Sequence, residues 1–276
     1  MIRIEPRESP SRRLTIGIPV ASALLALLLA AIPLSFAGAN IGEAYQQMAK
    51  GIFGSLFAFT EMLTRATPLI FTGLAATLAF RAKLWNIGAE GQLYLGAMAA
   101  VAVGTGWLDG PPILLIPVIL IAGALAGALG MAGPAYLKTR FGADEVVTTL
   151  LLNFIILIFI QMMLEGPLKD PMGMGWPQSS PVVDNALLPQ ILPRMRLHYG
   201  LIIALVAAVV AHIMLSKSVW GLKLRAVGEN ASAALHAGIG VKRTLMSAAL
   251  ISGALAGLAG VSEVAGLRGY LTTDLS

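Results

Sequence analysis

Residues 86–92 (Asn-Ile-Gly-Ala-Glu-Gly-Gln) are well suited to chemistry, because they place a carboxylate, two amides and two glycines among apolar residues. The stretch follows the apolar run 67–80 and opens another, 93–103. Polar side chains in a membrane helix cost free energy unless they line a cavity or pair inside a bundle. We therefore expect these residues to lie where something passes through the membrane.

The spacing within this stretch predicts how its side chains are arranged. On a continuous helix, Asn86 and Glu90 are four residues apart and share a face, whereas Gln92 points elsewhere. Gly88 and Gly91 flank the carboxylate, so the helix breaks easily there and a small polar solute can approach closely. Two interpretations stay open: Glu90 lines a translocation pathway, or it only hydrogen-bonds a neighbouring helix.

A second polar group, the amide of Asn153, lies within the apolar run 146–164. It either joins two helices by hydrogen bonds or lines the same pathway as residues 86–92. The three histidines lack metal-ligand spacing and the chain has no cysteine, so the sequence predicts no metal site and no catalytic residue.

The composition is that of a membrane protein. Of the 276 residues, 57% are hydrophobic and 12% charged, whereas a soluble domain has about 25% charged residues. The apolar runs are continuous rather than alternating, which favours helices over a β-barrel. The net charge of +5 comes from basic residues in short loops, so it indicates membrane topology and not nucleic-acid binding.

Several segments are apolar enough to cross a bilayer, which takes about 20 residues per helix. We expect about seven spans, at residues 14–36, 66–80, 87–107, 113–137, 146–164, 199–215 and 245–265. The second could extend over 53–63, and the third is interrupted by its own polar motif. The predicted fold is an all-α membrane helix bundle with a broken third helix. Residues 1–13 form an N-terminal tail and 14–276 one transmembrane domain.

The distribution of basic residues predicts the orientation. About twice as many Lys and Arg fall on the N-terminal side of the membrane as on the other, which places the N-terminus in the cytoplasm. On this topology the external loop 165–197 contains many prolines, and it is either an ordered cap or a mobile loop. The amphipathic segment 41–63 is expected to lie along the membrane surface.

Two glycine pairs predict helix contacts. Gly123-x-x-x-Gly127 and Gly253-x-x-x-Gly257 allow backbones to approach closely. Similar residues surround the two pairs, and the topology makes the two helices antiparallel. An inverted repeat and a chance likeness of Ala/Gly/Leu helices both stay open.

The cytoplasmic loop 217–243 contains a predicted short helix. Asn230 is a good N-cap for the alanine-rich residues 231–237, and Gly238 is a good stop. Such a short helix is marginal alone, so it is expected to dock onto another surface. It either receives force from a soluble partner or belongs to an ordinary basic loop.

Together these elements carry a family resemblance. Residues 67–75 (TPLIFTGLA), 80–92 (FRAKLWNIGAEGQ), 145–153 (EVVTTLLLN) and 224–230 (LRAVGEN) resemble permeases of nucleoside-type ABC importers, within the branched-chain amino acid and simple-sugar permease group. The likeness runs from about residue 67 to 265. Such permeases continue with further helices where this chain stops, so it is expected to be shorter than the family at that end.

The resemblance implies a transport subunit of the bacterial plasma (inner) membrane. Its implied partners are a second permease, often a paralogue, a cytoplasmic ABC ATPase and an external substrate-binding lipoprotein or periplasmic protein. By position, the pathway residues are Asn86, Glu90, Gln92 and Asn153. The ATPase-coupling residues are Arg225, Gly228, Glu229, Asn230 and Gly238.

The sequence leaves a competing function open. The chain has no phosphate-binding loop, so ATP and Mg²⁺ belong to a partner, and no cofactor is expected in this chain. We therefore predict the membrane subunit of an ATP-driven importer for nucleosides or related small polar solutes, which is not itself an enzyme. The alternative is an ion-coupled secondary transporter that uses Glu90.

Overall fold

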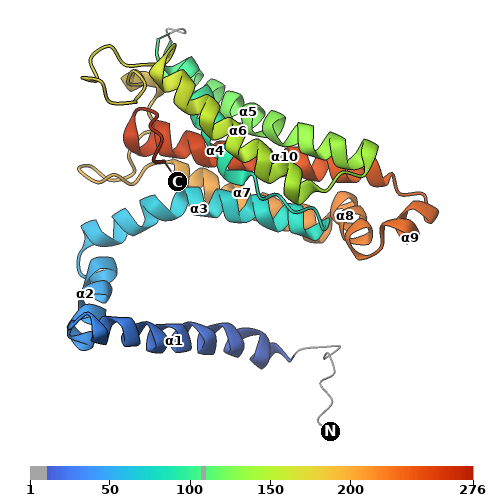
Figure 1. Cartoon of the computed structure of the whole chain (residues 1–276), viewed down its shortest axis with the longest axis horizontal. Coiled ribbons are helices and arrows are strands. Elements are labelled where there is room, and N and C mark those ends of the chain that lie inside the picture. Colours follow the sequence, from blue (N-terminus) through green and yellow to red (C-terminus); the bar gives the residue numbers. More distant parts are fainter. Residues whose placement is uncertain (1–10, 107–109, 276) are drawn as a thin grey trace. The chain divides into compact units, whose positions relative to one another are not determined.

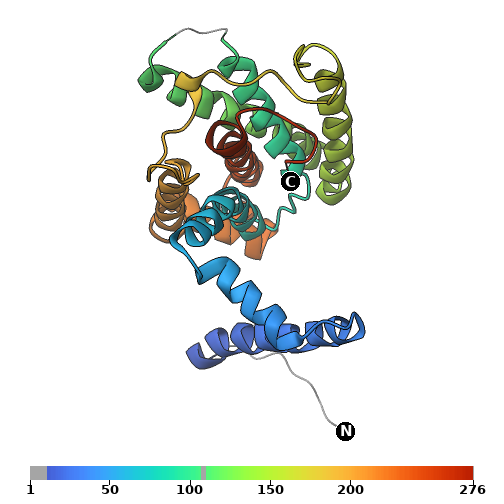
Figure 2. The same cartoon turned by 90° about the vertical axis from the view of Figure 1, so that its left-hand side faces the viewer.

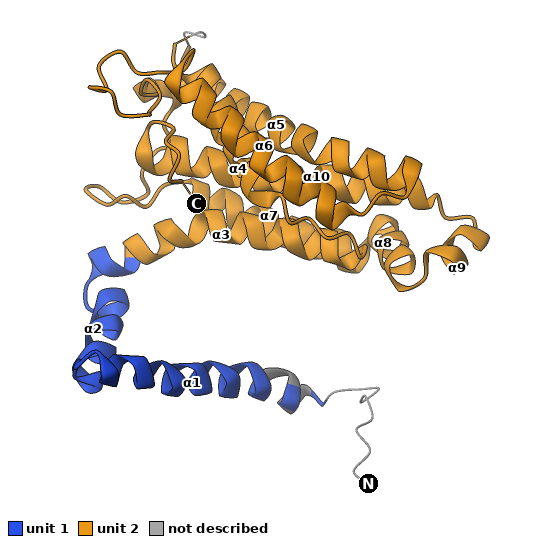
Figure 3. Cartoon of the chain, viewed as in Figure 1, with its two compact units in different colours: residues 1–59 blue, residues 60–276 orange. Residues whose placement is uncertain are grey.

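The computed structural model describes residues 11–106 and 110–275 of the chain. The chain divides into two compact units, residues 1–59 and 60–276, which Figure 3 distinguishes by colour. Two predicted features fall outside the described residues: most of the tail 1–13 and the end of the third span at Trp107.

The first unit contains helices α1 (Arg12–Phe36) and α2 (Ile41–Phe53). The Asn40 side chain caps α2 by accepting hydrogen bonds from two backbone N–H groups of its first turn. The Tyr45 hydroxyl donates to the backbone carbonyl of Leu27 and so joins α2 to α1. No residue in the apolar span of α1 is buried within the chain, so this surface suits lipid.

The second unit is a bundle of long helices. They are α3 (Leu56–Arg81, its first residues in the other unit), α4 (Ala89–Gly104), α5 (Pro112–Phe141), α6 (Glu145–Glu165), α7 (Gly200–Lys217) and α10 (Val241–Glu263). Figures 1 and 2 show α10 lying among the others. It is the most buried span, with 61% of its apolar window buried. A π-helical turn, η2 (Val264–Arg268), follows α10 directly.

The helices confirm the predicted all-α membrane bundle. Among the described residues, six helices are long and apolar enough to cross a membrane: α1, α3, α5, α6, α7 and α10. The seventh predicted span corresponds to α4, whose 16 residues cover about 24 Å, less than the roughly 30 Å of a hydrocarbon core. The irregular residues 82–88 precede α4, so the third crossing is a broken helix.

The predicted surface segment 41–63 is divided between two helices. Helix α2 ends at Phe53 and Gly54 caps it, so residues 56–63 belong to α3. The Ser55 hydroxyl then accepts a hydrogen bond from the backbone N–H of Ala58 (3.0 Å) and starts α3. The longer form of the second span, which includes residues 53–63, is therefore the better prediction.

The predicted glycine contacts are confirmed, and the two pairs contact each other. A Cβ atom added at Gly127 would overlap the backbone carbonyl of Gly253, and one added at Gly257 would overlap that of Gly123. The crossed pairing makes α5 and α10 antiparallel. The third helix at this contact is α4, since a Cβ at Gly96 would overlap the Gly257 carbonyl. Close packing of α4, α5 and α10 therefore depends on glycines, which have no side chain to separate the backbones.

The proline-rich loop between α6 and α7 packs as a cap across the ends of α4 and α10. Its backbone bonds are Ser179 N–H to Leu271 O (2.9 Å), Val182 N–H to Gly269 O (2.7 Å), Val183 N–H to Gly104 O (2.8 Å) and Leu188 N–H to Ala265 O (2.7 Å). The short 3₁₀ turn η1 (Asp184–Ala186) lies within it. The structure therefore supports the ordered cap among the two interpretations of this loop.

The opposite end of the bundle carries two short helices, α8 (Val219–Glu229) and α9 (Ala231–His236), as Figure 1 shows. The sequence predicted α9 and its stop correctly. Asn230 accepts a hydrogen bond from Ala233 N–H (3.0 Å), and Gly238 has a positive φ of 77°. The sequence analysis did not find α8, which was included in the predicted basic loop 217–243.

Candidate functional site

Backbone N–H groups of the irregular segment before α4 donate hydrogen bonds to side chains of α6. Three side chains spaced four residues apart on α6 accept from backbone N–H groups around the start of α4. The pairs are Glu145 with Trp85 (3.4 Å), Thr149 with Ile87 (3.3 Å) and Asn153 with Gly91. A single face of α6 therefore replaces the helical hydrogen bonds that this segment lacks.

Asn86 and Gln92 form a buried amide pair. The Asn86 Nδ2 donates to Gln92 Oε1 (2.8 Å), and the Gln92 Nε2 donates to Asn86 Oδ1 (2.9 Å). Asn86 also donates to the Ser252 hydroxyl (3.1 Å), which itself donates to the Ala75 carbonyl (2.9 Å). The pair thus links α4 to α10 and α3 in the interior of the bundle.

This pairing corrects the predicted arrangement of the motif. Asn86 and Glu90 were expected to share a helix face, with Gln92 pointing elsewhere. The helix begins only at Ala89, so Asn86 lies outside it, and its side chain turns toward Gln92 instead. Glu90 lies on another side of α4, where its Oε2 accepts a hydrogen bond from Asn153 Nδ2 (3.0 Å).

Glu90 opens onto a cavity of about 410 Å³, which we call the carboxylate pocket. Its polar lining residues come from α3, α4, α10 and the π-helical turn: Arg65, Thr72, Glu90, Glu263 and Arg268. Asn153, near the middle of α6, does not line the pocket but binds the Glu90 carboxylate from the interior side. The first turn of α4 also favours a negative charge at Glu90 through the helix dipole.

The charged residues that line this pocket are equal in number, two carboxylates (Glu90 and Glu263) and two guanidinium groups (Arg65 and Arg268). Outside the lining, Arg65 also pairs with Glu61 (3.6 Å). The Arg268 Nε lies 3.7 Å from Glu263 Oε2, and its Nη1 lies 3.1 Å from Asp274 Oδ1. Glu263 is only 8% exposed, so the ion pair with Arg268 offsets part of the cost of burying it.

The sequence analysis missed Glu263 and Arg268. A carboxylate inside the apolar run 245–265 is the signal that could have found the site, because such groups are expensive unless they line a cavity or pair. The spacing of five residues to Arg268 gives no such signal, since on an α-helix these positions do not face each other. The π-helical turn Val264–Arg268 changes that geometry and brings the two charges together.

A buried histidine supports the cap beside this pocket. His198 is 1% exposed, and its Nδ1 accepts a hydrogen bond from the backbone N–H of Gly200 (3.1 Å). A Cβ atom at Gly266 would overlap the His198 ring, so the ring packs directly on the π-helical turn. Burial lowers the pKa of His198 to about 4, so the ring is neutral at pH 7.

The predicted coupling residues all lie at the α8–α9 end, but some are exposed and others pack against the chain's own helices. Glu229 and Asn230 are exposed, and Asn230 caps α9. Gly238, also exposed, donates its N–H to the Leu235 carbonyl (3.0 Å) and ends α9. These three residues lie on or beside a surface that a partner could reach.

Arg225 and Gly228 contact the chain's own helices instead. The Arg225 Nη1 donates to the carbonyl of Leu215 at the end of α7. Gly228 is buried, and a Cβ atom there would overlap the carbonyl of Arg81 at the end of α3. These two residues therefore hold α8 against α7 and α3.

Comparison with known proteins decides the class. Residues 58–274 match the family described as "Branched-chain amino acid transport system / permease component". The chain belongs to this permease family. The match covers nearly all of the second compact unit, which contains the carboxylate pocket and the α8–α9 end.

Named relatives of this permease come from bacteria and an archaeon. The guanosine ABC transporter permease protein NupP of Bacillus subtilis is 39% identical over 92% of this chain and 73% of its own length. The glucose ABC transporter permease protein TsgB13 of Haloferax volcanii is 34% identical, with 97% and 73% covered. The nucleoside ABC transporter permease protein NupB of Lactococcus lactis is 33% identical, with 88% and 69% covered. No solved structure matches the chain.

Family membership confirms the predicted class of function. The permease is a multi-pass membrane subunit of an ATP-driven transporter, and ATP hydrolysis belongs to a separate partner chain. Membership also implies an ATPase and a substrate-binding protein as partners. These assignments favour the ATP-driven transporter over the ion-coupled alternative.

Proposed function

We propose that this permease imports neutral polar solutes, nucleosides first among them, and that they pass the carboxylate pocket. The observation that carries the proposal is the balanced set of two carboxylates and two guanidinium groups at the start of a broken helix. Such a set offers hydrogen-bond donors and acceptors to hydroxyl and amide groups without attracting a net charge. Relatives named for guanosine, nucleosides and glucose share this kind of solute.

Within this proposal the predicted pathway residues have different roles. Glu90 contacts the solute, because it opens onto the pocket. Asn153 is a positioning residue, since it binds both the Glu90 carboxylate and the backbone N–H of Gly91. Asn86 and Gln92 fix the start of α4 through their buried pair and do not face the pocket.

The assembly that we propose follows from the relatives and the charge pattern. Bacillus subtilis has two guanosine permease proteins, NupP and NupQ, that are both similar to this chain, which supports a paired second permease subunit. From the excess of basic residues we infer that the N-terminus, α8 and α9 lie on the cytoplasmic side of the plasma membrane. There the exposed Glu229 and Asn230 would meet the ATPase, which alone would use ATP and Mg²⁺.

Uptake measurements test both the solute and the energy source. The permease is expressed with its partner subunits in a host that lacks nucleoside uptake, and import of labelled guanosine is followed. We expect uptake that excess unlabelled nucleoside suppresses and excess leucine does not. An ATPase variant without its phosphate-loop lysine is expected to abolish uptake.

An uncoupler distinguishes the competing mechanism. With cellular ATP held constant, collapse of the ion gradient is expected to leave import intact. Import that survives loss of the ATPase but stops with the uncoupler would instead make Glu90 an ion-coupling site. Suppression by leucine and not by nucleosides would refute the proposed solute class.

A further inference from the structure

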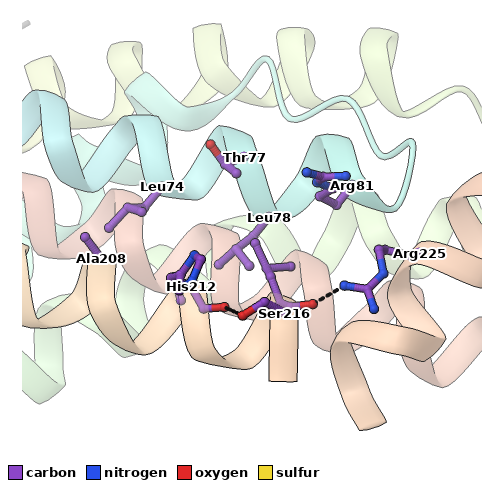
Figure 4. A pocket seen from close by; sticks show the side chains of 10 residues that line it. Leu74, Thr77, Leu78, Arg81, Ala208, His212, Ser216 and Arg225 are labelled. Carbon is purple, nitrogen blue, oxygen red and sulfur yellow. Dashed lines mark hydrogen bonds between the residues drawn. The ribbon is translucent and has the colours of Figure 1, made fainter. Parts of the chain in front are cut away.

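A second cavity, of about 320 Å³, lies between α3, α7 and α8 (Figure 4). We call it the arginine pocket, and its polar lining residues are Thr77 and Arg81 on α3, His212 and Ser216 on α7, and Arg225 on α8. It lies at the α8–α9 end of the bundle, away from the carboxylate pocket. Only Arg225 among its residues was predicted to have a role, in ATPase coupling, and no role in binding a ligand was predicted for the cavity.

The two guanidinium groups of this pocket have no carboxylate partner. Among the described residues, neither Arg81 nor Arg225 forms an ion pair within 4.0 Å. Glu229, one turn further along α8, is exposed and does not reach Arg225. The Arg225 Nη1 donates to the Leu215 carbonyl, which leaves the other donors of its fork available. Figure 4 shows Arg81 and Arg225 on the two sides of the cavity.

The remaining lining of the pocket is apolar. Leu74 and Leu78 of α3 face Ala208, Ala211 and Leu215 of α7. Arg81 at the end of α3 and Arg225 on α8 lie at one end of the cavity, and most of the apolar residues lie deeper along α3 and α7, where Thr77 and His212 are their polar neighbours. A cavity with this division accepts a molecule that has an anionic head and a hydrocarbon tail.

We propose that the arginine pocket binds the phosphate group of an anionic phospholipid, with an acyl chain against the apolar part between α3 and α7. Guanidinium groups bind phosphate oxygens by paired, charge-assisted hydrogen bonds. The bound lipid joins the end of α3 to α7 and α8. We assign the site to a membrane lipid and not to free phosphate, because a free phosphate would leave the apolar part of the cavity without contacts.

Native mass spectrometry of the purified, detergent-solubilised permease tests the site. The protein is titrated with phosphatidylglycerol, with phosphatidylcholine of the same acyl chains, and with inorganic phosphate. We expect phosphatidylglycerol to bind at least about tenfold more tightly than phosphatidylcholine. The double variant Arg81→Gln/Arg225→Gln is expected to lose about 30-fold in affinity, since each basic residue near an anionic lipid contributes about fivefold.

Three further variants keep the test decisive. Arg140→Gln/Arg243→Gln removes two exposed arginines outside the pocket and is expected to bind phosphatidylglycerol as the unmodified chain does. Ala208→Phe fills the apolar part without touching either cation, so it is expected to weaken lipid binding even if the double variant does not fold. Arg81→Lys/Arg225→Lys keeps both charges and is expected to retain most of the binding.

Four results would overturn the proposal. The first is equal binding of the two lipids, and the second is lipid binding that neither the double variant nor Ala208→Phe weakens. The third is inorganic phosphate displacing the lipid at equal concentration, which would make the ligand a soluble anion. If the double variant keeps its lipid but loses the ATPase on co-purification, the pocket is a protein contact and the lipid assignment is wrong.

Discussion

The carboxylate pocket and the arginine pocket lie along the same helix, α3, but they arrange charge differently. In the first, two carboxylates balance two guanidinium groups, and in the second two guanidinium groups face no described carboxylate. A balanced set suits a solute that must bind and then leave, whereas uncompensated cations suit an anion that stays. The difference teaches that the ligand of a membrane cavity is indicated less by the charged residues alone than by whether each has a partner of opposite charge.

Acid is expected to damage the side of the bundle that contains the carboxylate pocket. The imidazole of His198 has an ordinary pKa of 6.5, and burial lowers it to about 4 in the folded chain. Between these values the unfolded chain binds a proton that the folded chain does not, so stability falls as the pH falls. The free energy of unfolding is expected to be about 3 kcal/mol lower at pH 4 than above pH 6.5. Thermal unfolding across this pH range measures the difference.

The variant His198→Gln is the direct check on this decline. It is expected to remove most of the pH dependence between 6.5 and 4. His236, which is exposed on α9, provides the control, since His236→Gln should keep the decline. A curve for His198→Gln that still falls as steeply would show that another group is responsible.

Loss of the Glu90 charge is expected to reduce uptake about 10- to 100-fold, the cost of one hydrogen bond between a charged group and the solute. The variant Glu90→Gln keeps the shape of the side chain and should leave assembly and ATPase binding intact. Uptake and co-purification are measured together. Glu165→Gln, at the exposed end of α6, is the matched control. Loss of folding in Glu90→Gln alone would show that the carboxylate is structural.

Removal of the Asn153 amide is expected to cost about 1–3 kcal/mol of stability, because the Gly91 N–H is then buried without its acceptor. Uptake by Asn153→Ala should fall about tenfold as Glu90 loses its position. Gln161→Ala, which removes an exposed amide on the same helix, should change neither quantity. An unchanged melting temperature in Asn153→Ala would contradict the proposed positioning role of this residue.

The variant Arg268→Gln sharpens the comparison by unbalancing the carboxylate pocket. Glu263 then loses its ion-pair partner, and the pocket gains one net negative charge. Competition for uptake by a cationic solute analogue is expected to improve about fivefold over the unmodified permease, the effect of about 1 kcal/mol for one partly exposed charge. A uniform loss of uptake with no change in preference would contradict the importance of the balance.

Local features of the fold could be predicted from the sequence. The capping of α9 by Asn230 and its end at Gly238 depend on residues within one turn of the helix ends, so a single stretch of sequence contains the information. The four-residue spacing of the glycines also predicted close helix contacts at both pairs, although not that the pairs on α5 and α10 contact each other. The polar motif was correctly placed at the mouth of a broken helix for the same reason.

The partners of the motif could not be predicted. Asn86 pairs with Gln92 because Ser252, far away in the sequence, completes its hydrogen bonds, and no local pattern shows this. Glu263 and Arg268 meet only because one turn is π-helical, a departure from α-helical spacing that the sequence does not announce. The candidate site therefore emerged from one predicted residue, Glu90, and from charges that the fold brings to it.

The hydrogen bonds from α6 fix the segment before α4 from one side only. Trp85, Ile87 and Gly91 are tied to α6, whereas Asn86 is tied to Ser252 of α10, whose hydroxyl donates to a carbonyl of α3. Three helices therefore hold the start of the broken helix together, so displacing any one of them is expected to strain the backbone next to Glu90.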